Sequence, residues 1–238
     1  MRHKIKLLWA NQLFRGTSIF FVGNLIVSGF AFLFHWILPR LLGPVEFGTL
    51  AAVLGLIYVV GIPMNALDFL VTKLVSSFEK NNIWVHSRSF LEFILHKLSL
   101  VVVISIPFTW LISGSIKDFL KLPDTLAIWA VWLLAVLSIV ITIARSILRG
   151  LMRYTDLLAN QVTEIFLRLV LAVTLVLAIS AWYGWGLWGI VLATIAALIV
   201  SVYQLRQVWS VEAVPFDHHK WPLKSLGTSS LLLAFSYT

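Results

Sequence analysis

The stretch Leu38–Gly48, LPRLLGPVEFG, decides the fold, because it separates two long segments without charged residues. The segment before it, 16–39, contains no Asp, Glu, Lys or Arg, and neither does the segment 47–67 after it. Each is long enough to cross a bilayer core of about 30 Å, which takes roughly 20 helical residues. Between them, Gly43 adopts conformations that other residues avoid, and Pro44 cannot continue a helix. The stretch therefore predicts the compact turn of a membrane hairpin.

The composition sets the class of protein. Of the 238 residues, 60% are hydrophobic and only 12% are charged, and the mean hydropathy is +0.96. A soluble domain carries about 25% charged residues. The basic start leads into a span that is too long for the core of a signal peptide. The chain has no cysteine, which excludes disulfides and thiolate metal sites. These features predict an all-α polytopic membrane protein.

Six spans are predicted, over 16–38, 47–71, 98–116, 125–144 and two within 169–205. A polar segment, 76–97, is expected to connect the second and third spans as a cytoplasmic helix. The run 169–205 lacks charged residues and His and is long enough for two spans. The stretch WYGWGLWG, Trp182–Gly189, is expected to form the turn between them. Its aromatic residues indicate an interfacial belt, with a platform for sugar rings as the alternative.

Three regions are expected along the chain. Residues 1–208 form a six-helix bundle, 209–224 form a cytoplasmic loop, and 225–238 start a seventh helix, inside which the sequence stops. The loop contains Asp217, His218 and His219. Adjacent histidines are a weak metal signal without further ligands at suitable spacing, so neither a metal nor another cofactor is predicted.

The basic residues predict the orientation. With the N-terminus in the cytoplasm, every Lys and Arg lies on the inner side except Arg40, Lys117 and Lys121. Such a bias orients membrane proteins, and it also accounts for the net charge of +8 without a nucleic-acid partner. We expect a multi-pass protein of the cell membrane, in contact with membrane lipids.

Polar residues within the first two spans are candidates for a substrate site. Asn24 and Ser28 share a helical face, where they line a cavity or bond a neighbouring helix. Asp68 and Lys73 come near the end of the second span. A carboxylate at membrane depth is a functional candidate, although both side chains would reach the interface if the span ends early.

Arginines supply the other candidates. Arg145, Arg149 and Arg153 share a face if the fourth helix continues that far, and they either anchor the helix at the inner interface or face a phosphate. Arg40 in the first turn has the same two interpretations. Glu164 and Arg168 are spaced as a favourable helical ion pair.

Several stretches resemble the oligosaccharide and polysaccharide flippases of the MATE-like transporter superfamily. LLGPVEFG is similar to the first turn of that family. The run ARSILRGLMRYTDLLANQVTEIFLRLVLAV, residues 144–173, is similar to its connection between the fourth and fifth helices, through an LRGxxRF core and a Q-x-x-E-x-x-x-R-L pattern. The resemblance covers nearly the whole chain.

The resemblance implies a fold of two six-helix lobes around a central cavity, of which this chain would supply the N-terminal one. The second lobe would be missing, or a homodimer would replace it. In the related flippases of lipid-linked peptidoglycan precursors the first helix carries an Arg-Asp pair. Phe34 and His35 stand at the corresponding positions, which argues against that substrate.

The leading functional prediction is a transporter that flips a lipid-linked oligosaccharide, carried on undecaprenyl diphosphate, from the inner to the outer leaflet. The candidates that would contact substrate are Asn24, Arg40, Asp68, Lys73, Arg145 and Arg149, with Asp68 as the coupling group. The alternatives are a MATE-type exporter of small organic cations and an inactive truncated product. The exporter requires acidic residues deep in the spans, and only Asp68 is expected there. An enzyme is disfavoured because paired catalytic carboxylates are not evident.

Overall fold

The computed structural model describes residues 2–78, 83–122 and 124–212, with the backbone alone for residues 2–20 and Val60. Within these ranges the regular elements are all helices, in the order α1 (Arg2–Ser76), α2 (Ile83–Leu120), α3 (Leu126–Gly150), α4 (Tyr154–Ala178), α5 (Tyr183–Gln204) and α6 (Arg206–Trp209). Helices α1 to α5 are long and apolar enough to cross a membrane. The predicted all-α polytopic class is confirmed. The proposed seventh helix and the Asp217–His219 triplet lie outside the described residues.

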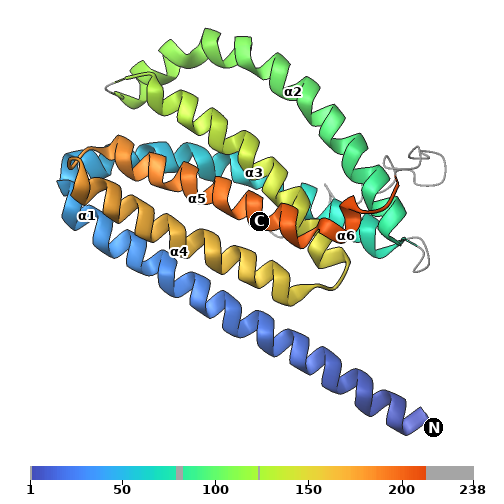
Figure 1. The fold of residues 1–238 in the computed structure, drawn as a ribbon. Helices are drawn as coiled ribbons and strands as arrows, with labels where there is room; N and C mark the ends of the chain where they lie inside the picture. The colour runs from blue at the N-terminus through green and yellow to red at the C-terminus, as the bar shows by residue number, and fades with distance from the viewer. Residues whose placement is uncertain (1, 79–82, 123, 213–238) are drawn as a thin grey trace.

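Helix α1 is a hairpin of two arms that run in opposite directions and spread apart from the turn, with α4 and α5 drawn between them (Figure 1). Only Gly43 interrupts it, with φ 78° and ψ 173°. A positive φ is open to glycine because it lacks a Cβ atom, and Pro44 suits the first position of the second arm. The turn is therefore much shorter than the predicted stretch Leu38–Gly48. Because Gly43 divides α1, the five long helices provide six segments that could cross a membrane, which is the number predicted.

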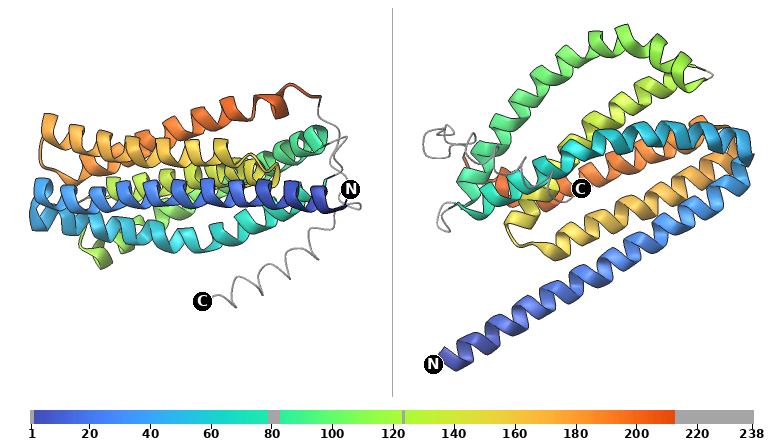
Figure 2. Two further views of the ribbon diagram at one scale, coloured as in Figure 1. Left: turned by 90° about the horizontal axis from the view of Figure 1, so that it is seen from below. Right: turned by 180° about the vertical axis from the view of Figure 1, so that it is seen from behind.

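Helix α2 joins two segments that the sequence analysis separated. The part of the predicted polar connection from Ile83 onward and the predicted third span continue into each other as one helix. It is buried only near its ends, at Ser87–Leu91 and at Ser113. Between these points it arches away from the other helices (Figures 1 and 2). A hydrogen bond of 3.0 Å from Trp132 Nε1 of α3 to Ser105 Oγ links its middle to the bundle.

Helix α3 runs past its predicted end, so Arg145 and Arg149 lie within its last turns. Arg153 lies beyond it and precedes the first residue of α4. The prediction that these three arginines share one helical face is therefore wrong for Arg153, because the chain turns at Leu151 and Met152.

Helix α4 begins at Tyr154, fifteen residues before the predicted charge-free run. It includes Glu164 and Arg168, whose pairing lets the helix continue through charged positions. The turn to α5 lies at residues 179–182, so most of Trp182–Gly189 forms the first turns of α5 rather than the predicted turn.

Two hydrophobic clusters hold the helices together. One lies toward the end of the bundle that carries Gly43, here called the hairpin end, and includes Leu38, Leu50 and Tyr183. The other lies toward the opposite end, here called the α6 end, and includes Phe90, Leu157 and Val208. The backbones of α4 and α5 touch, because a Cβ on Gly189 would lie 2.6 Å from the backbone of Ala172. Such close approach is typical of packed membrane helices.

Candidate functional site

A cluster of charged side chains joins α3 and α4 in the interior of the bundle. Arg145 of α3 donates from Nη2 to Glu164 Oε2 at 2.6 Å. Arg168 donates from Nη2 to Glu164 Oε1 at 2.8 Å, one helical turn along α4. The Glu164 side chain is only 11% exposed, and the Thr194 hydroxyl of α5 lies 3.3 Å from its Oε1. Three groups from three helices thus converge on one carboxylate.

Asn160 braces this cluster from one turn before Glu164. It is fully buried, and its Oδ1 accepts a hydrogen bond of 2.8 Å from Arg145 Nε. Its Nδ2 donates to the Ala197 carbonyl at 2.7 Å and to Ser201 Oγ at 2.9 Å, both on α5. Since every polar atom of the amide has a partner, Asn160 fixes the position of Arg145 relative to α5.

The cluster lies deep within its helix. At about 1.5 Å per residue, Glu164 is roughly 15 Å and Arg168 roughly 21 Å from Tyr154, in the middle third of α4. Ionised side chains at the middle of a membrane span are costly and mark functional positions. One carboxylate faces two guanidinium groups, so the cluster has a net positive charge. Chemically, this arrangement is suited to an anion.

A second polar group connects α1 to α3. Asp68 forms an ion pair with Arg149, and its Oδ1 lies 2.5 Å from the hydroxyl of Ser146. Both side chains of the pair are about a quarter exposed, at 26% and 28%. The two predicted residues Asp68 and Arg149 are therefore brought together. Arg149 is one turn from Arg145, so α3 carries both polar groups.

The other predicted site residues lie apart from these groups. Arg40 is exposed at the hairpin end, where its guanidinium lies 3.7 Å from the Trp36 ring and Nη1 donates to the Trp36 carbonyl at 3.1 Å. Lys73 is exposed near the end of α1. Asn24 is half-buried on the first arm of α1, next to Gly23, which packs against Leu158 of α4.

A third polar group lies at the hairpin end. Glu46 accepts the backbone N–H of Tyr183 at 2.9 Å, at the start of α5. The hydroxyl of Tyr183 donates to Asp124 at 2.8 Å, and Asp124 also accepts the N–H of Ala127 at the start of α3. The acidic residue of the GPVEF turn thus has a structural role, since it ties the hairpin to α5.

Sequence reasoning missed the centre of the cluster. Glu164 lies within α4, a helix long and apolar enough to cross a membrane, so Asp68 is not the only carboxylate in such a helix. Asn160, Glu164 and Arg168 were not predicted as site residues, because the fifth span was expected to begin after them, within 169–205. The signal that could have found them is the spacing of Asn160, Glu164 and Arg168 at i, i+4 and i+8, which places them on one helical face.

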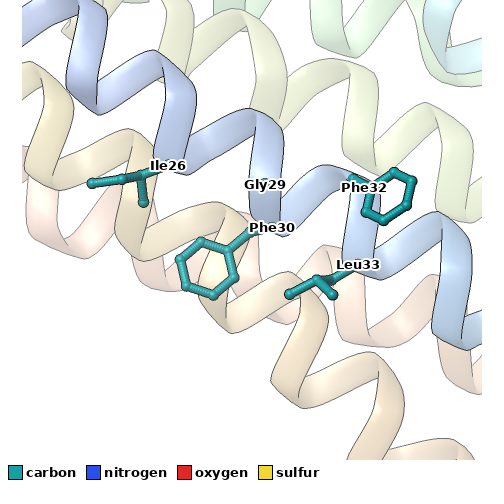
Figure 3. A pocket seen from close by; sticks show the side chains of 5 residues that line it. All are labelled: Ile26, Gly29, Phe30, Phe32 and Leu33. Atoms are coloured by element: carbon teal, nitrogen blue, oxygen red, sulfur yellow. The ribbon is translucent and has the colours of Figure 1, made fainter.

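A shallow open depression of about 450 Å³ lies on the first arm of α1, between Ile26, Gly29, Phe30, Phe32 and Leu33 (Figure 3). The ring of Phe30 packs edge-on against Phe166 of α4, with centroids 5.5 Å apart. The lining is almost wholly apolar, so it lacks groups that would bind a charged molecule. Among the described residues, three or more His, Asp or Glu side chains do not gather into a possible metal site.

Comparison with known proteins supplies a family. The family described as "Polysaccharide biosynthesis protein" matches residues 13–237. An uncharacterised membrane protein of Methanocaldococcus jannaschii is 28% identical over 206 residues, which make up 84% of this chain and 46% of that protein. The chain thus spans about half the length of this relative. A search of solved structures gave no match.

Proposed function

The chain belongs to the polysaccharide biosynthesis protein family, and on this basis we propose that it forms one lobe of a transporter of lipid-linked oligosaccharide. In this proposal the substrate is carried on undecaprenyl diphosphate and moves from the inner to the outer leaflet, and no covalent bond is made or broken. The relative from Methanocaldococcus jannaschii is about twice as long as this chain, and that length is compatible with the two lobes of a MATE-like transporter. The second lobe would come from further residues or from a second copy of the chain.

The observation that carries the proposal is the excess positive charge at Arg145, Glu164 and Arg168, midway along a helix that is long and apolar enough to cross a membrane. A diphosphate headgroup that crosses the bilayer needs cationic partners at this depth, and arginine binds phosphate oxygens with paired hydrogen bonds. Asp68 remains the proposed coupling group. Because it is paired with Arg149, coupling would require this pair to open.

Export of small organic cations is the alternative. It requires acidic residues within the membrane-spanning helices, and Glu164 is such a residue. Glu164 lies midway along α4, but two arginines and the Thr194 hydroxyl already surround it. An organic cation would have to displace one arginine from Glu164. The site would then hold three positive charges and one carboxylate. The charge balance therefore favours an anionic substrate.

The proposal also fixes an orientation. The N-terminus and the α6 end would lie in the cytoplasm, and the hairpin end would lie outside the cell membrane. Asp124, Glu46 and Tyr183 would then join the helices at the outer surface, where the aromatic residues near the start of α5 fit an interfacial belt.

Deletion of the gene tests the function. We expect surface polysaccharide to be lost and lipid-linked oligosaccharide to accumulate in the inner leaflet, and the wild-type gene should restore export. A Lys121→Gln gene should restore it equally, because Lys121 is exposed at the end of α2. Unchanged surface polysaccharide in the deletion strain would contradict the proposal.

A further inference from the structure

The two arginines that share Glu164 are held very differently. Arg145 is 17% exposed in its side chain and has a second fixed partner, the buried oxygen of Asn160. Arg168 is 31% exposed, and its buried Nε has no acceptor among the described residues. A buried donor without a partner is costly and needs an explanation.

The two arginines also differ in what their movement would disturb. Withdrawal of Arg145 would break the contacts from α3 to both Glu164 and Asn160, and Asn160 anchors α5. Arg168 is on the same helix as Glu164, so its side chain can leave the carboxylate without separating two helices. After such a movement Glu164 would still have Arg145 as its counter-ion at 2.6 Å.

We propose that Glu164 takes the place of a substrate phosphate in the empty transporter, and that Arg168 is the arginine that moves from Glu164 to the phosphate. This inference rests on the proposed function and specifies the binding step at that site. With the phosphate bound, Glu164 and Arg145 form a neutral pair, and the charge of Arg168 is balanced by the ligand. The freed guanidinium of Arg168 offers a planar set of hydrogen-bond donors that suits phosphate oxygens.

The same face of α4 indicates what lies beside the phosphate. Gln161 precedes Glu164 by three residues and Arg168 by seven, so all three project from one side of the helix. The buried Oε1 of Gln161 accepts no hydrogen bond from the described residues. A sugar hydroxyl next to the phosphate would supply one, so the chemical class that fits this face is a phosphate attached to a sugar.

Binding to the purified full chain tests the inference. The chain is placed in phosphatidylcholine nanodiscs, whose zwitterionic headgroups carry no net charge, and the probe is undecaprenyl diphosphate. Arg168→Gln is expected to weaken binding about tenfold, which corresponds to the loss of a charged hydrogen bond. Glu164→Gln is expected to strengthen binding, because the competing carboxylate is gone. Weaker binding by Glu164→Gln, or unchanged binding by Arg168→Gln, would overturn the inference.

Two further probes identify the chemistry that is recognised. Inorganic pyrophosphate should show the same opposite responses to the two substitutions, since it shares the diphosphate group. Undecaprenol has no phosphate, and its binding should respond to neither. A dependence of undecaprenol binding on Arg168 would contradict a role in phosphate recognition.

A second substitution covers the case in which Glu164→Gln does not fold. Glu164→Asp keeps a charge for Arg145 but shortens the side chain, which loosens the contact with Arg168. Binding of undecaprenyl diphosphate should again strengthen, and weaker binding in the folded variant would count against the inference. If gene deletion abolishes export and an Arg168→Gln gene restores it fully, the proposed function stands and this inference fails.

Discussion

Glu46 accepts the backbone N–H of Tyr183 at 2.9 Å, which joins two residues 137 positions apart in the chain. Tyr183 is 2% exposed and begins α5, and its hydroxyl is bonded to Asp124. Because the first N–H groups of a helix have no partner within the helix, an acceptor here stabilises α5 directly. The acidic residue of the hairpin turn therefore acts in the manner of a helix cap.

Substitution of Glu46 tests this role. Glu46→Ala removes the acceptor and is expected to reduce the free energy of unfolding by about 1 kcal/mol, the usual effect of losing a cap. Thermal unfolding of the purified chain in detergent measures the change. Glu46→Gln keeps a side-chain oxygen at the same reach and should retain most of the stability. Equal losses in both variants would show that charge, rather than the hydrogen bond, matters.

The pairing of Asp68 with Arg149 predicts energetic coupling between α1 and α3. Asp68→Asn and Arg149→Gln are each expected to destabilise the chain, and the double variant should lose less than the sum of the two. A coupling energy of about 1 kcal/mol or more is expected for partners in direct contact. Unfolding of the four proteins in one detergent measures it. Strictly additive losses would mean that the pair contributes no direct interaction.

The contact between α4 and α5 predicts strong sensitivity at Gly189. A Cβ there would lie 2.6 Å from the backbone of Ala172, so Gly189→Ala must push the helices apart. We expect a loss of about 3 kcal/mol, at the upper end for overpacking. Gly55→Ala is the matched control, because a Cβ at Gly55 meets nothing within 4 Å. Similar stabilities of the two variants would contradict the close approach of α4 and α5.

The proposed orientation can be tested with single cysteines, because the natural chain contains none. Lys121→Cys lies at the hairpin end, and Met152→Cys lies at the turn between α3 and α4. In intact cells a membrane-impermeant maleimide should label the first variant, and it should label the second only after permeabilisation. The opposite pattern would place the N-terminus outside the cytoplasm.

Much of the fold follows from the sequence, because charge-free runs of about 20 residues report the apolar environment directly. The class, the hairpin and the number of crossing segments could be predicted in this way. The helix bounds could not, since a helix continues wherever its polar side chains find partners. Arg149 is paired with Asp68, and Glu164 is paired with Arg145. Both α3 and α4 therefore extend through charged positions.

The candidate site could be predicted only in part. Asp68, Arg145 and Arg149 were named from depth and charge, and the structure pairs each with a carboxylate or guanidinium on another helix. Which partner each would find depends on how three helices pack. Local spacing could not reveal that Asn160 contacts Ala197, because 37 positions separate them.

The single-residue turn at Gly43 has a consequence for how the chain enters the membrane during synthesis. With only Gly43 outside regular helix, no loop is left to be passed across the bilayer ahead of the second arm. We therefore expect the two arms to leave the insertion machinery together, as one preformed unit. The turn at Gly43 would then expose almost no unfolded peptide to proteases or antibodies. An epitope inserted at this turn would separate the two arms.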